Sequence, residues 1–287
     1  METQSTEHIA VLMTVHNRRE KTLKCLRNIS SMEYDRVKYM LEVFMTDDGC
    51  TDGTAEAVLE EFPDTHIISG DGELFWNRGM YAAWQEASKR DFDYYWWVND
   101  DTFVFQDTLS RMLACSEEHS NSAITVGSTI SSHESGNVTY GGFIKGKLIT
   151  DLTISHKCDT LNGNLVLIPR AVFSQLGTND PYYRHSLGDM DYGLRANERG
   201  IEIWTVPGAC GICDTHEHLT VWMDPRMPIN KRWHNFFSPI GNNPFEFFHY
   251  TKTHYGILRA IVLFTSNFCH FLFPRLWTKK LQSVKNR

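Results

Sequence analysis

Short apolar runs alternate with amphipathic stretches along the first hundred residues. A run of four to eight apolar residues predicts a buried strand, whereas apolar residues at helical spacing predict a helix. The expected strands span residues 9–15, 39–48, 65–70 and 94–101, and the expected helices between them span 19–32, 51–62 and 77–90. This alternation indicates an α/β fold, with a parallel sheet covered by helices on both faces.

Polar residues follow three of the expected strands at the point where each strand ends. They are "TVHN" at 14–17, "TDDG" at 46–49 and "NDD" at 99–101. In open sheets of this kind ligands bind outside the carboxyl ends of the strands. The sequence therefore predicts a ligand site formed by these three segments.

The third segment places Asp100 and Asp101 directly after the aromatic run "DYYWWV". Two adjacent carboxylates repel each other unless a cation or hydrogen-bond donors compensate them. A hard divalent ion such as Mg²⁺ or Mn²⁺ prefers such oxygen ligands and commonly bridges substrate phosphates. The pair alone also fits a simpler interpretation, in which the two acids only cap the next turn.

Charge and cysteine content limit the classes of function. The 287 residues carry a formal net charge of -7, with a pI of about 6.0, which argues against a nucleic-acid binder held by a basic field. The seven cysteines are odd in number and irregularly spaced, and the first residues do not resemble a signal peptide. We therefore expect free thiols and a cytoplasmic location.

The most apolar segment lies near the C-terminus. Residues 257–277 are interrupted by polar residues and fall short of the roughly 18–20 apolar residues that span a bilayer. Two interpretations stay open, because an aromatic segment with basic flanks fits both a helix at a membrane interface and a helix packed on its own domain.

Four motifs in a fixed order carry a family resemblance. They are "VLMTVHNRREKTLKCL", "TDDGCTDGT", "NDDT" and "LGDMDYGLRANERG". Together they resemble the family 2 glycosyltransferases of the GT-A fold over roughly residues 8–235. "GDGELFWNRGM" and "CDTHEHLTVWMDPRMPINKRW" are further similar to bacterial enzymes of surface-polysaccharide synthesis, including rhamnosyltransferase-like members.

The resemblance implies a domain organisation. A GT-A domain would span residues 1–235, with a donor half of about 1–105 and an acceptor half of about 106–235. A C-terminal helical segment would follow at 236–287, for which the membrane interface remains one of the two interpretations.

The resemblance also implies a donor-nucleotide site. Thr14 and Val15 would border the base, and Asp48 would hydrogen-bond a pyrimidine. Arg78, in the segment "GDGELFWNRGM", would contact the pyrophosphate, although a turn with a core aromatic at Trp76 explains the same segment.

The motif "NDDT" stands where the family has D-x-D. Asn99 replaces the first acid and is assigned to the donor nucleotide, because an amide can still hydrogen-bond a ribose hydroxyl. Asp100, the middle residue, is assigned to the donor site without direct contact to the metal. Asp101 is the expected ligand of Mn²⁺ or Mg²⁺.

The acceptor side is implied by two later segments. Asn162 and Gly163 would form a polar tip beneath the sugar. In "LGDMDYG" Gly188 stands where the family commonly has Glu, and Asp189 takes the position of the general base. Asp191 is placed on the acceptor side, where its spacing of four residues from Arg195 suits a supporting salt bridge.

The segment "CGICDTHEH" at 210–218 leaves three interpretations open. Many GT-A enzymes place a C-terminal histidine on the donor metal, and His216 fits that role best, with His218 second. A zinc site is an alternative, because thiolate and imidazole suit Zn²⁺. The third interpretation is that the segment binds no metal.

The expected activity is transfer of a sugar from a UDP- or dTDP-linked donor to a glycan or lipid-linked acceptor. The reaction would be metal-dependent and inverting, since a single base serves an in-line displacement and no protein nucleophile is evident. Two alternatives remain. One is a nucleotidyltransferase, and the other is a sugar-nucleotide-binding protein without catalytic activity. Expected contacts are the donor, the acceptor and a membrane surface, but not nucleic acid.

Overall fold

The expected strand–helix alternation of the first hundred residues is confirmed. The computed structural model describes residues 6–133, 136–215 and 220–275. Its first half contains, in chain order, β1 (Glu7–Val15), α1 (Arg19–Ser30), β2 (Tyr39–Asp47), α2 (Thr54–Glu61), β3 (His66–Ser69), α3 (Phe75–Ala87) and β4 (Tyr94–Val98). Helix α3 begins two residues before the expected helix, so the loop that precedes it ends at Leu74.

Later parts of the chain extend the same sheet and add a small second sheet. They contain β5 (Phe103–Val104), α4 (Thr108–Glu118), β6 (Ile124–Ile130), β7 (Val138–Tyr140), β8 (Gly142–Ile144), β9 (Lys147–Leu148), β10 (Thr160–Leu161), β11 (Leu165–Pro169), α5 (Arg170–Leu176), α6 (Gly188–Glu198) and β12 (Ile203–Ile212). Among the described residues the large sheet has the order β3-β2-β1-β4-β11-β6-β12-β5, with β7 paired to β6, and β10-β8-β9 form a small second sheet.

Strands β1 to β4 run parallel. Strand β11 is antiparallel to its neighbours β4 and β6, whereas β12 runs parallel to β6 and antiparallel to β5. Strand β1 pairs in parallel with β2 on one side and with β4 on the other. The chain thus leaves β1 in one direction along the sheet and returns on its other side, which is the switch point where open α/β sheets bind ligands. The carboxyl ends of β1, β2 and β4 meet there.

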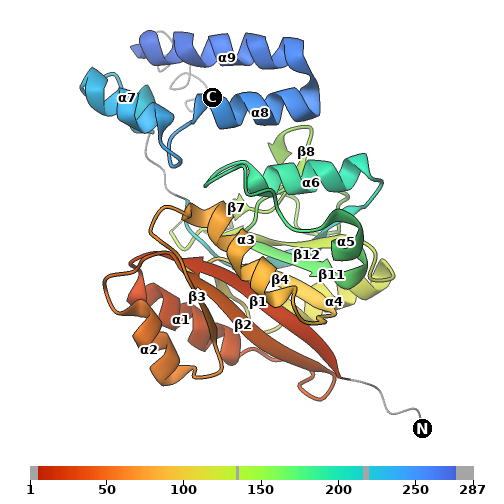
Figure 1. Cartoon of the computed structure of the whole chain (residues 1–287). Coiled ribbons are helices and arrows are strands. Elements are labelled where there is room, and N and C mark those ends of the chain that lie inside the picture. The colour runs from red at the N-terminus through yellow and green to blue at the C-terminus, as the bar shows by residue number, and fades with distance from the viewer. Residues whose placement is uncertain (1–5, 134–135, 216–219, 276–287) are drawn as a thin grey trace. The chain divides into compact units, whose positions relative to one another are not determined.

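Side chains on the two faces of the sheet form two separate cores. On one face Ile9, Val11 and Met13 of β1 and Trp96 of β4 pack against α1, α2 and α4. On the other face Ala10, Leu12 and Trp97 pack against side chains of α3, α5 and α6. These helices are labelled in Figure 1. Because all five residues of β4 are buried, both faces of this strand are covered. The aromatic run before the acid pair is therefore a central strand of the sheet.

Contacts divide the chain into two compact units. The first contains residues 1–181 and 188–215, and the second contains 182–187 and 216–287. The expected domain boundary at residue 235 remains a prediction.

The second unit is helical within its described residues. It contains the 3₁₀ helix η1 (Val221–Met223), α7 (Ile229–Phe237), α8 (Pro244–Tyr255) and α9 (Ile257–Leu272). Trp222, Phe236 and Phe271 form its small buried core. None of the helices in the described residues is long and apolar enough to cross a membrane.

Candidate active site

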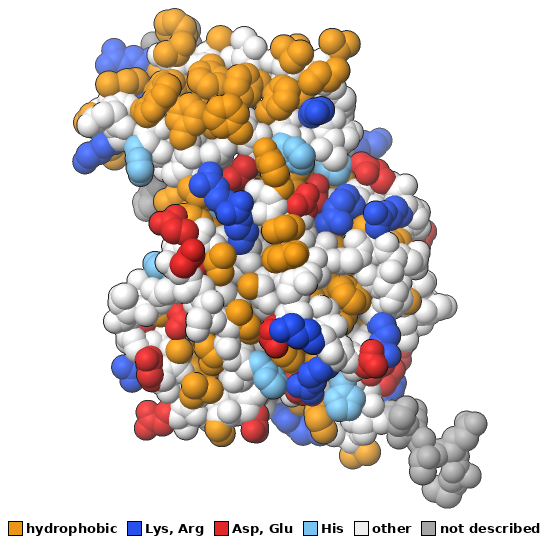
Figure 2. Space-filling view, viewed as in Figure 1, with side chains coloured by type: hydrophobic (Ala, Val, Ile, Leu, Met, Phe, Trp, Pro, Cys, Tyr) orange, Lys and Arg blue, Asp and Glu red, His pale blue; other side chains and the backbone are white. Residues whose placement is uncertain are grey.

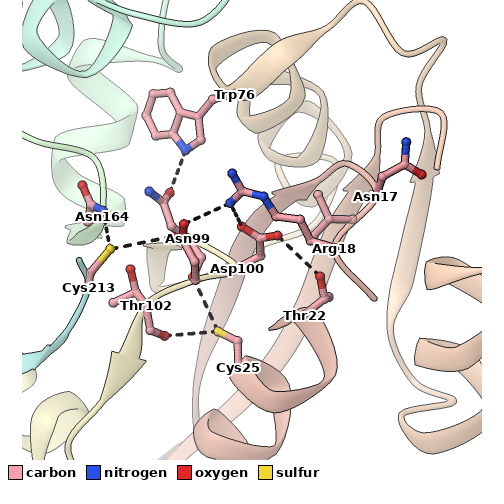
Figure 3. A network of polar contacts seen from close by, with 12 residues as sticks. Asn17, Arg18, Thr22, Cys25, Trp76, Asn99, Asp100, Thr102, Asn164 and Cys213 are labelled. Atoms are coloured by element: carbon pink, nitrogen blue, oxygen red, sulfur yellow. Dashed lines mark hydrogen bonds and ion pairs between the residues drawn. The ribbon is translucent and has the colours of Figure 1, made fainter. Parts of the chain in front are cut away.

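The acid pair lies directly beyond the carboxyl end of β4, beneath a cation from the loop after β1. One guanidinium nitrogen of Arg18, Nη1, lies 3.1 Å from Asp100 Oδ1 (Figure 3). The same nitrogen lies 3.0 Å from Asp101 Oδ2. Thr22 of α1 donates a long hydrogen bond, 3.5 Å, to the other oxygen of Asp100. Cys213 donates from its thiol to Asp101 Oδ1 at 3.7 Å. The two carboxylates are thus compensated by one cation and two neutral donors.

Burial makes ionisation of Asp100 costly. Its side chain is 6% exposed, compared with 19% for Asp101. Burial raises the pKa of Asp100 to about 6; the charge of Arg18 opposes this effect and that of Asp101 adds to it. Burial, and then the charge of Asp101, raises the pKa of Cys213 to about 12, so its thiol stays protonated and can donate. The site therefore concentrates negative charge in a place that favours a bound cation.

Asn99 connects the acid pair to the second half of the chain. The indole nitrogen of Trp76 donates to Asn99 Oδ1 at 2.7 Å (Figure 3). A Cβ atom at Gly163 would lie 2.4 Å from the Trp76 ring, so only glycine fits at position 163. The backbone nitrogen of Gly163 in turn donates to Asp189 Oδ2 at 2.9 Å. One chain of contacts thus joins Asp189 to "NDD".

Asp189 lies in the first turn of α6, where the helix dipole favours a negative charge. Its other carboxylate oxygen accepts a hydrogen bond from Met190 N at 2.8 Å. Burial raises the pKa of Asp189, and hydrogen bonds from Gly163, Met190 and the Asn162 side chain oppose that effect. A carboxylate with a raised pKa is a better proton acceptor, as a general base requires.

The structure explains why glycine stands at position 188. A Cβ atom there would lie 1.8 Å from Oδ1 of Asn77, which is fully buried at the start of α3. Asn77 is held in place by Asp180 O, to which it donates at 2.7 Å, and by Asn179, which donates to it. This chain therefore places an amide where the family commonly has the Glu side chain.

Asp48 is buried and fully engaged with the loop before α3. Its carboxylate accepts hydrogen bonds from the backbone nitrogens of Gly72 at 2.9 Å, Leu74 at 3.2 Å and Phe75 at 2.8 Å. Its carbonyl oxygen lies 2.6 Å from His16 Nδ1. Asp48 thereby orders the loop 70–75 against the end of β2. Its expected contact with a pyrimidine remains a prediction.

The remaining donor-side residues lie around the same strand ends. Thr14 packs against α3, because a Cβ atom at Gly79 would lie 2.0 Å from Thr14 Oγ1. Val15 is buried at the last position of β1, and its carbonyl accepts from Asp48 N. Arg78 donates to Pro181 O at 2.8 Å, in the segment before α6. Its contact with a pyrophosphate also remains a prediction.

Asp191 has the supporting partner that its spacing predicted. Its Oδ2 lies 2.8 Å from Nε of Arg195, and Asp191 is almost fully buried. Arg195 also donates to Thr178 O at 3.0 Å. The pair therefore joins α6 to the loop after α5. His216 and His218 lie outside the described residues.

The sequence assigns no role to Arg18, Thr22 or Asn164, and it offers Cys213 only as a ligand in the zinc alternative. Asn164 accepts from Asn99 N through its carbonyl and donates to the Cys213 sulfur at 3.5 Å. Arg18 follows the first strand in the motif "TVHNRRE". Because that strand end is expected to lie near the acid pair, the position of this cation is the signal by which the sequence could have predicted the contact. Within the described residues no group of three or more His, Cys, Asp or Glu side chains could hold a metal ion without further ligands.

Comparison with protein families decides the class of enzyme. The profile "Glycosyl transferase family 2" matches residues 10–177, which is more than half of the chain. The chain belongs to glycosyltransferase family 2. The resemblance carried by the four motifs is confirmed, and the protein is a glycosyltransferase and not a nucleotidyltransferase. A search of curated proteins finds no match.

Solved structures of glycosyltransferases share the fold at low sequence identity. A mannosyltransferase from Pyrobaculum calidifontis, solved with GDP-Man and Mn²⁺, aligns with a TM-score of 0.57 and 15% identity over 96% of this chain and 84% of its own. GalNAc-T7, solved with UDP, GalNAc and Mn²⁺, aligns with a TM-score of 0.56 and 14% identity over 81% of this chain and 48% of its own. Staphylococcus aureus TarS aligns with a TM-score of 0.55 and 11% identity over 73% of this chain. This chain spans only 37% of the TarS chain. The GT-A fold is thus confirmed.

Proposed function

We propose that this glycosyltransferase uses a UDP- or dTDP-linked sugar as donor and transfers the sugar with inversion to a glycan or lipid-linked acceptor. The observation that carries the proposal is the contact chain from the acid pair through Asn99, Trp76 and Gly163 to Asp189. It joins a cation-attracting group at the carboxyl end of β4 to a carboxylate whose pKa is raised. Such an arrangement suits a donor diphosphate near the acids and an acceptor hydroxyl near Asp189.

The residues present fit a divalent ion. Mg²⁺ and Mn²⁺ are typically held by one or two carboxylates, with substrate phosphates and water completing the shell. Asp101 is the proposed ligand, because its carboxylate is the more exposed of the pair, and His216 is the proposed second ligand. Two of the similar structures were solved with Mn²⁺ together with GDP-Man or with UDP and GalNAc, which supports this assignment. When bound, the ion would neutralise charge on the departing diphosphate.

Asp189 is the proposed general base. The pKa of an acceptor hydroxyl lies far above 7, so a carboxylate must take its proton as the hydroxyl attacks the donor carbon. The hydrogen bond from Gly163 and that from Met190 orient the two oxygens of Asp189. A single base without a protein nucleophile gives one displacement and therefore inversion.

The donor site is proposed to include Thr14, Val15, Asp48 and Arg78, together with Asn99 and Asp100. Two of the three backbone hydrogen bonds to Asp48 end on Oδ1 and one on Oδ2. Because each carboxylate oxygen can accept two hydrogen bonds, Oδ2 is the oxygen proposed to accept from the pyrimidine. On the acceptor side Asn162 and Gly163 are proposed to lie beneath the sugar, with Asp191 as support for α6.

The second unit is proposed to touch a membrane surface. Residues 220–275 carry six Lys or Arg and two Asp or Glu, a net charge of +4, although the whole chain carries -7. The apolar side chains of α9 include Leu258, which is 79% exposed, and Val262, which is 65% exposed. Figure 2 shows hydrophobic side chains gathered over this unit. A basic surface with exposed apolar side chains suits an anionic bilayer, where lipid-linked acceptors of bacterial polysaccharide synthesis would be found.

A thermal-shift titration with UDP and dTDP tests the donor and metal assignments together. Wild-type protein should be stabilised more by nucleotide with Mn²⁺ than by nucleotide with EDTA, and Asp101→Ala should remove that difference. A ligand at 100 times its dissociation constant stabilises by about 2.7 kcal/mol. Equal stabilisation by nucleotide with and without metal, in wild-type protein, would refute the metal assignment.

A further inference from the structure

Arg18 contacts the carboxylate to which the metal is assigned, Asp101, and also the adjacent carboxylate of Asp100. Its Nη1 atom lies within 3.1 Å of one oxygen of Asp100 and one of Asp101. The Arg18 side chain is 41% exposed, whereas Asp100 is 6% exposed. Arg18 is therefore a solvent-accessible cation that rests on a buried anion and can leave without unfolding its surroundings.

The other polar contacts of the motif leave few oxygens open to an ion. Asn99 Oδ1 accepts from Trp76, and Asp101 Oδ1 accepts from the Cys213 thiol (Figure 3). Trp76 and Cys213 are neutral donors, whereas Arg18 carries a full charge. A divalent ion within ligand distance of Asp101 Oδ2 would lie very close to the guanidinium, and two cations at that separation repel strongly.

The backbone around Arg18 is fixed by contacts that do not involve its side chain. Asn17 has a φ of 51°, in the left-handed region, and its side-chain oxygen accepts from Thr51 N at 2.7 Å. Arg19 N donates to Asp52 Oδ2 at 3.0 Å. Both contacts tie the loop after β1 to the loop after β2. The Arg18 side chain can thus move while its Cα atom stays in place at the start of α1.

We propose that Arg18 is an internal cation that holds the acid pair in the metal-free enzyme and competes with the divalent ion for Asp101. The inference rests on the metal assignment of the proposed function. It has two consequences. The nucleotide-free enzyme binds the ion weakly, because the ion must displace Arg18. The displaced guanidinium then pairs with the donor diphosphate, since bidentate Arg–phosphate pairs are strong.

Arg18 competes with the metal in the nucleotide-free enzyme and pairs with the diphosphate in the donor complex. Metal and nucleotide therefore bind cooperatively. Each ligand must strengthen binding of the other by the same factor, because coupling between two ligands is reciprocal. Arg18 would supply that coupling. Without Arg18 the metal should bind more tightly by itself, and nucleotide should gain less from the metal.

Mn²⁺ titration of nucleotide-free protein, followed by the electron paramagnetic resonance signal of free Mn²⁺, tests the competition. Arg18→Gln should bind Mn²⁺ roughly tenfold more tightly than wild type, within the 5–150-fold range of common couplings. Arg19→Gln is the matched control, because it removes the same charge one residue along and keeps the backbone bond to Asp52. It should bind Mn²⁺ within about twofold of wild type.

Two further measurements keep the outcome decisive. Arg18→Lys keeps a charge but has a shorter side chain, so its single nitrogen should reach the two carboxylates less well than Arg18 Nη1 does. Its Mn²⁺ affinity should therefore fall between the other two. The competition is refuted if Arg18→Gln shows a folded melting curve and binds Mn²⁺ no more tightly than wild type. If Arg18→Gln does not fold, the competition is refuted when Arg18→Lys binds Mn²⁺ with the same affinity as wild type. Metal-enhanced UDP binding by wild type, measured in parallel, then tells whether the metal assignment itself survives.

Discussion

Replacing Asp100 with Asn should stabilise the metal-free protein at neutral pH. The carboxylate is buried, and its pKa is raised to about 6 from the ordinary 3.8. A group whose pKa is higher in the folded state than in the unfolded state destabilises the fold when it is ionised. The gap from 3.8 to about 6 corresponds to about 3 kcal/mol at a pH well above 6, at 1.36 kcal/mol for each pKa unit.

The expected gain is smaller than this limit. Asn keeps the shape of the side chain but weakens its contact with Arg18, which stays paired with Asp101. We therefore expect the free energy of unfolding of Asp100→Asn to be about 1–3 kcal/mol higher than that of wild type at pH 7.5 in EDTA. This corresponds to an increase in melting temperature of about 2–4 °C for each kcal/mol.

The pH dependence distinguishes burial of the charge from other causes. As the pH falls through 6 toward 3.8, wild-type Asp100 becomes protonated in the folded state first, so the wild type regains the lost stability. The advantage of Asp100→Asn should shrink over this window and disappear below it. Asp101→Asn is the matched control, because it removes a carboxylate from the same guanidinium at a more exposed place. It should change stability by less than about 1 kcal/mol.

Urea unfolding followed by tryptophan fluorescence at pH 7.5, 6.0 and 4.5 measures all three proteins. If Asp100→Asn is no more stable than wild type at pH 7.5, or if its advantage does not change with pH, the reasoning is wrong.

Three other predictions concern α6 and the second unit. Asp191→Asn should lower the free energy of unfolding by about 1–3 kcal/mol, measured by urea unfolding, because its partner Arg195 loses a buried charged acceptor; an unchanged midpoint would contradict a supporting role. The acid limb of kcat should have an apparent pKa above 3.8, because Asp189 must be deprotonated and burial raises its pKa; a flat profile from pH 4 to 7 would argue against this base. Deletion of residues 257–287 should reduce sedimentation with anionic liposomes at low salt and preserve UDP binding, and failure of the full chain to sediment would exclude the membrane interface.

Local patterns predicted the parts of the fold that depend on local sequence. The apolar runs identified β1 and β4 because a strand buried on both faces must be apolar at nearly every position. Strands β2 and β3 are less buried, and their runs are correspondingly more polar. The strand–helix order predicted parallel pairing, and with it the meeting of "TVHN", "TDDG" and "NDD" at one edge. Strands β5 and β7 to β10 have only two or three residues each, too few for such runs. The pairing of the strands after β4 depends on residues far apart in the chain.

The contacts within the site lay beyond the reach of the sequence. Cys213 reaches Asp101 from 112 residues away, and Trp76 reaches Asn99 only because glycine at 163 leaves room for its ring. The departure at Gly188 likewise looked like a lost acid, whereas the structure gives it a steric cause in Asn77. Residue types showed which chemistry to expect, but tertiary packing determined which side chains meet.

The most direct test of the central claim is single-turnover transfer of radiolabelled sugar from UDP- and dTDP-sugars to a lipid-linked acceptor, for wild type and Asp189→Asn with Mn²⁺. Wild type should give transfer with inverted configuration at the anomeric carbon. Asp189→Asn should bind nucleotide normally but transfer roughly 10²–10⁴-fold more slowly, the range typical of a lost general base. Near-normal transfer by a folded Asp189→Asn variant, or a product with retained configuration, would contradict the account.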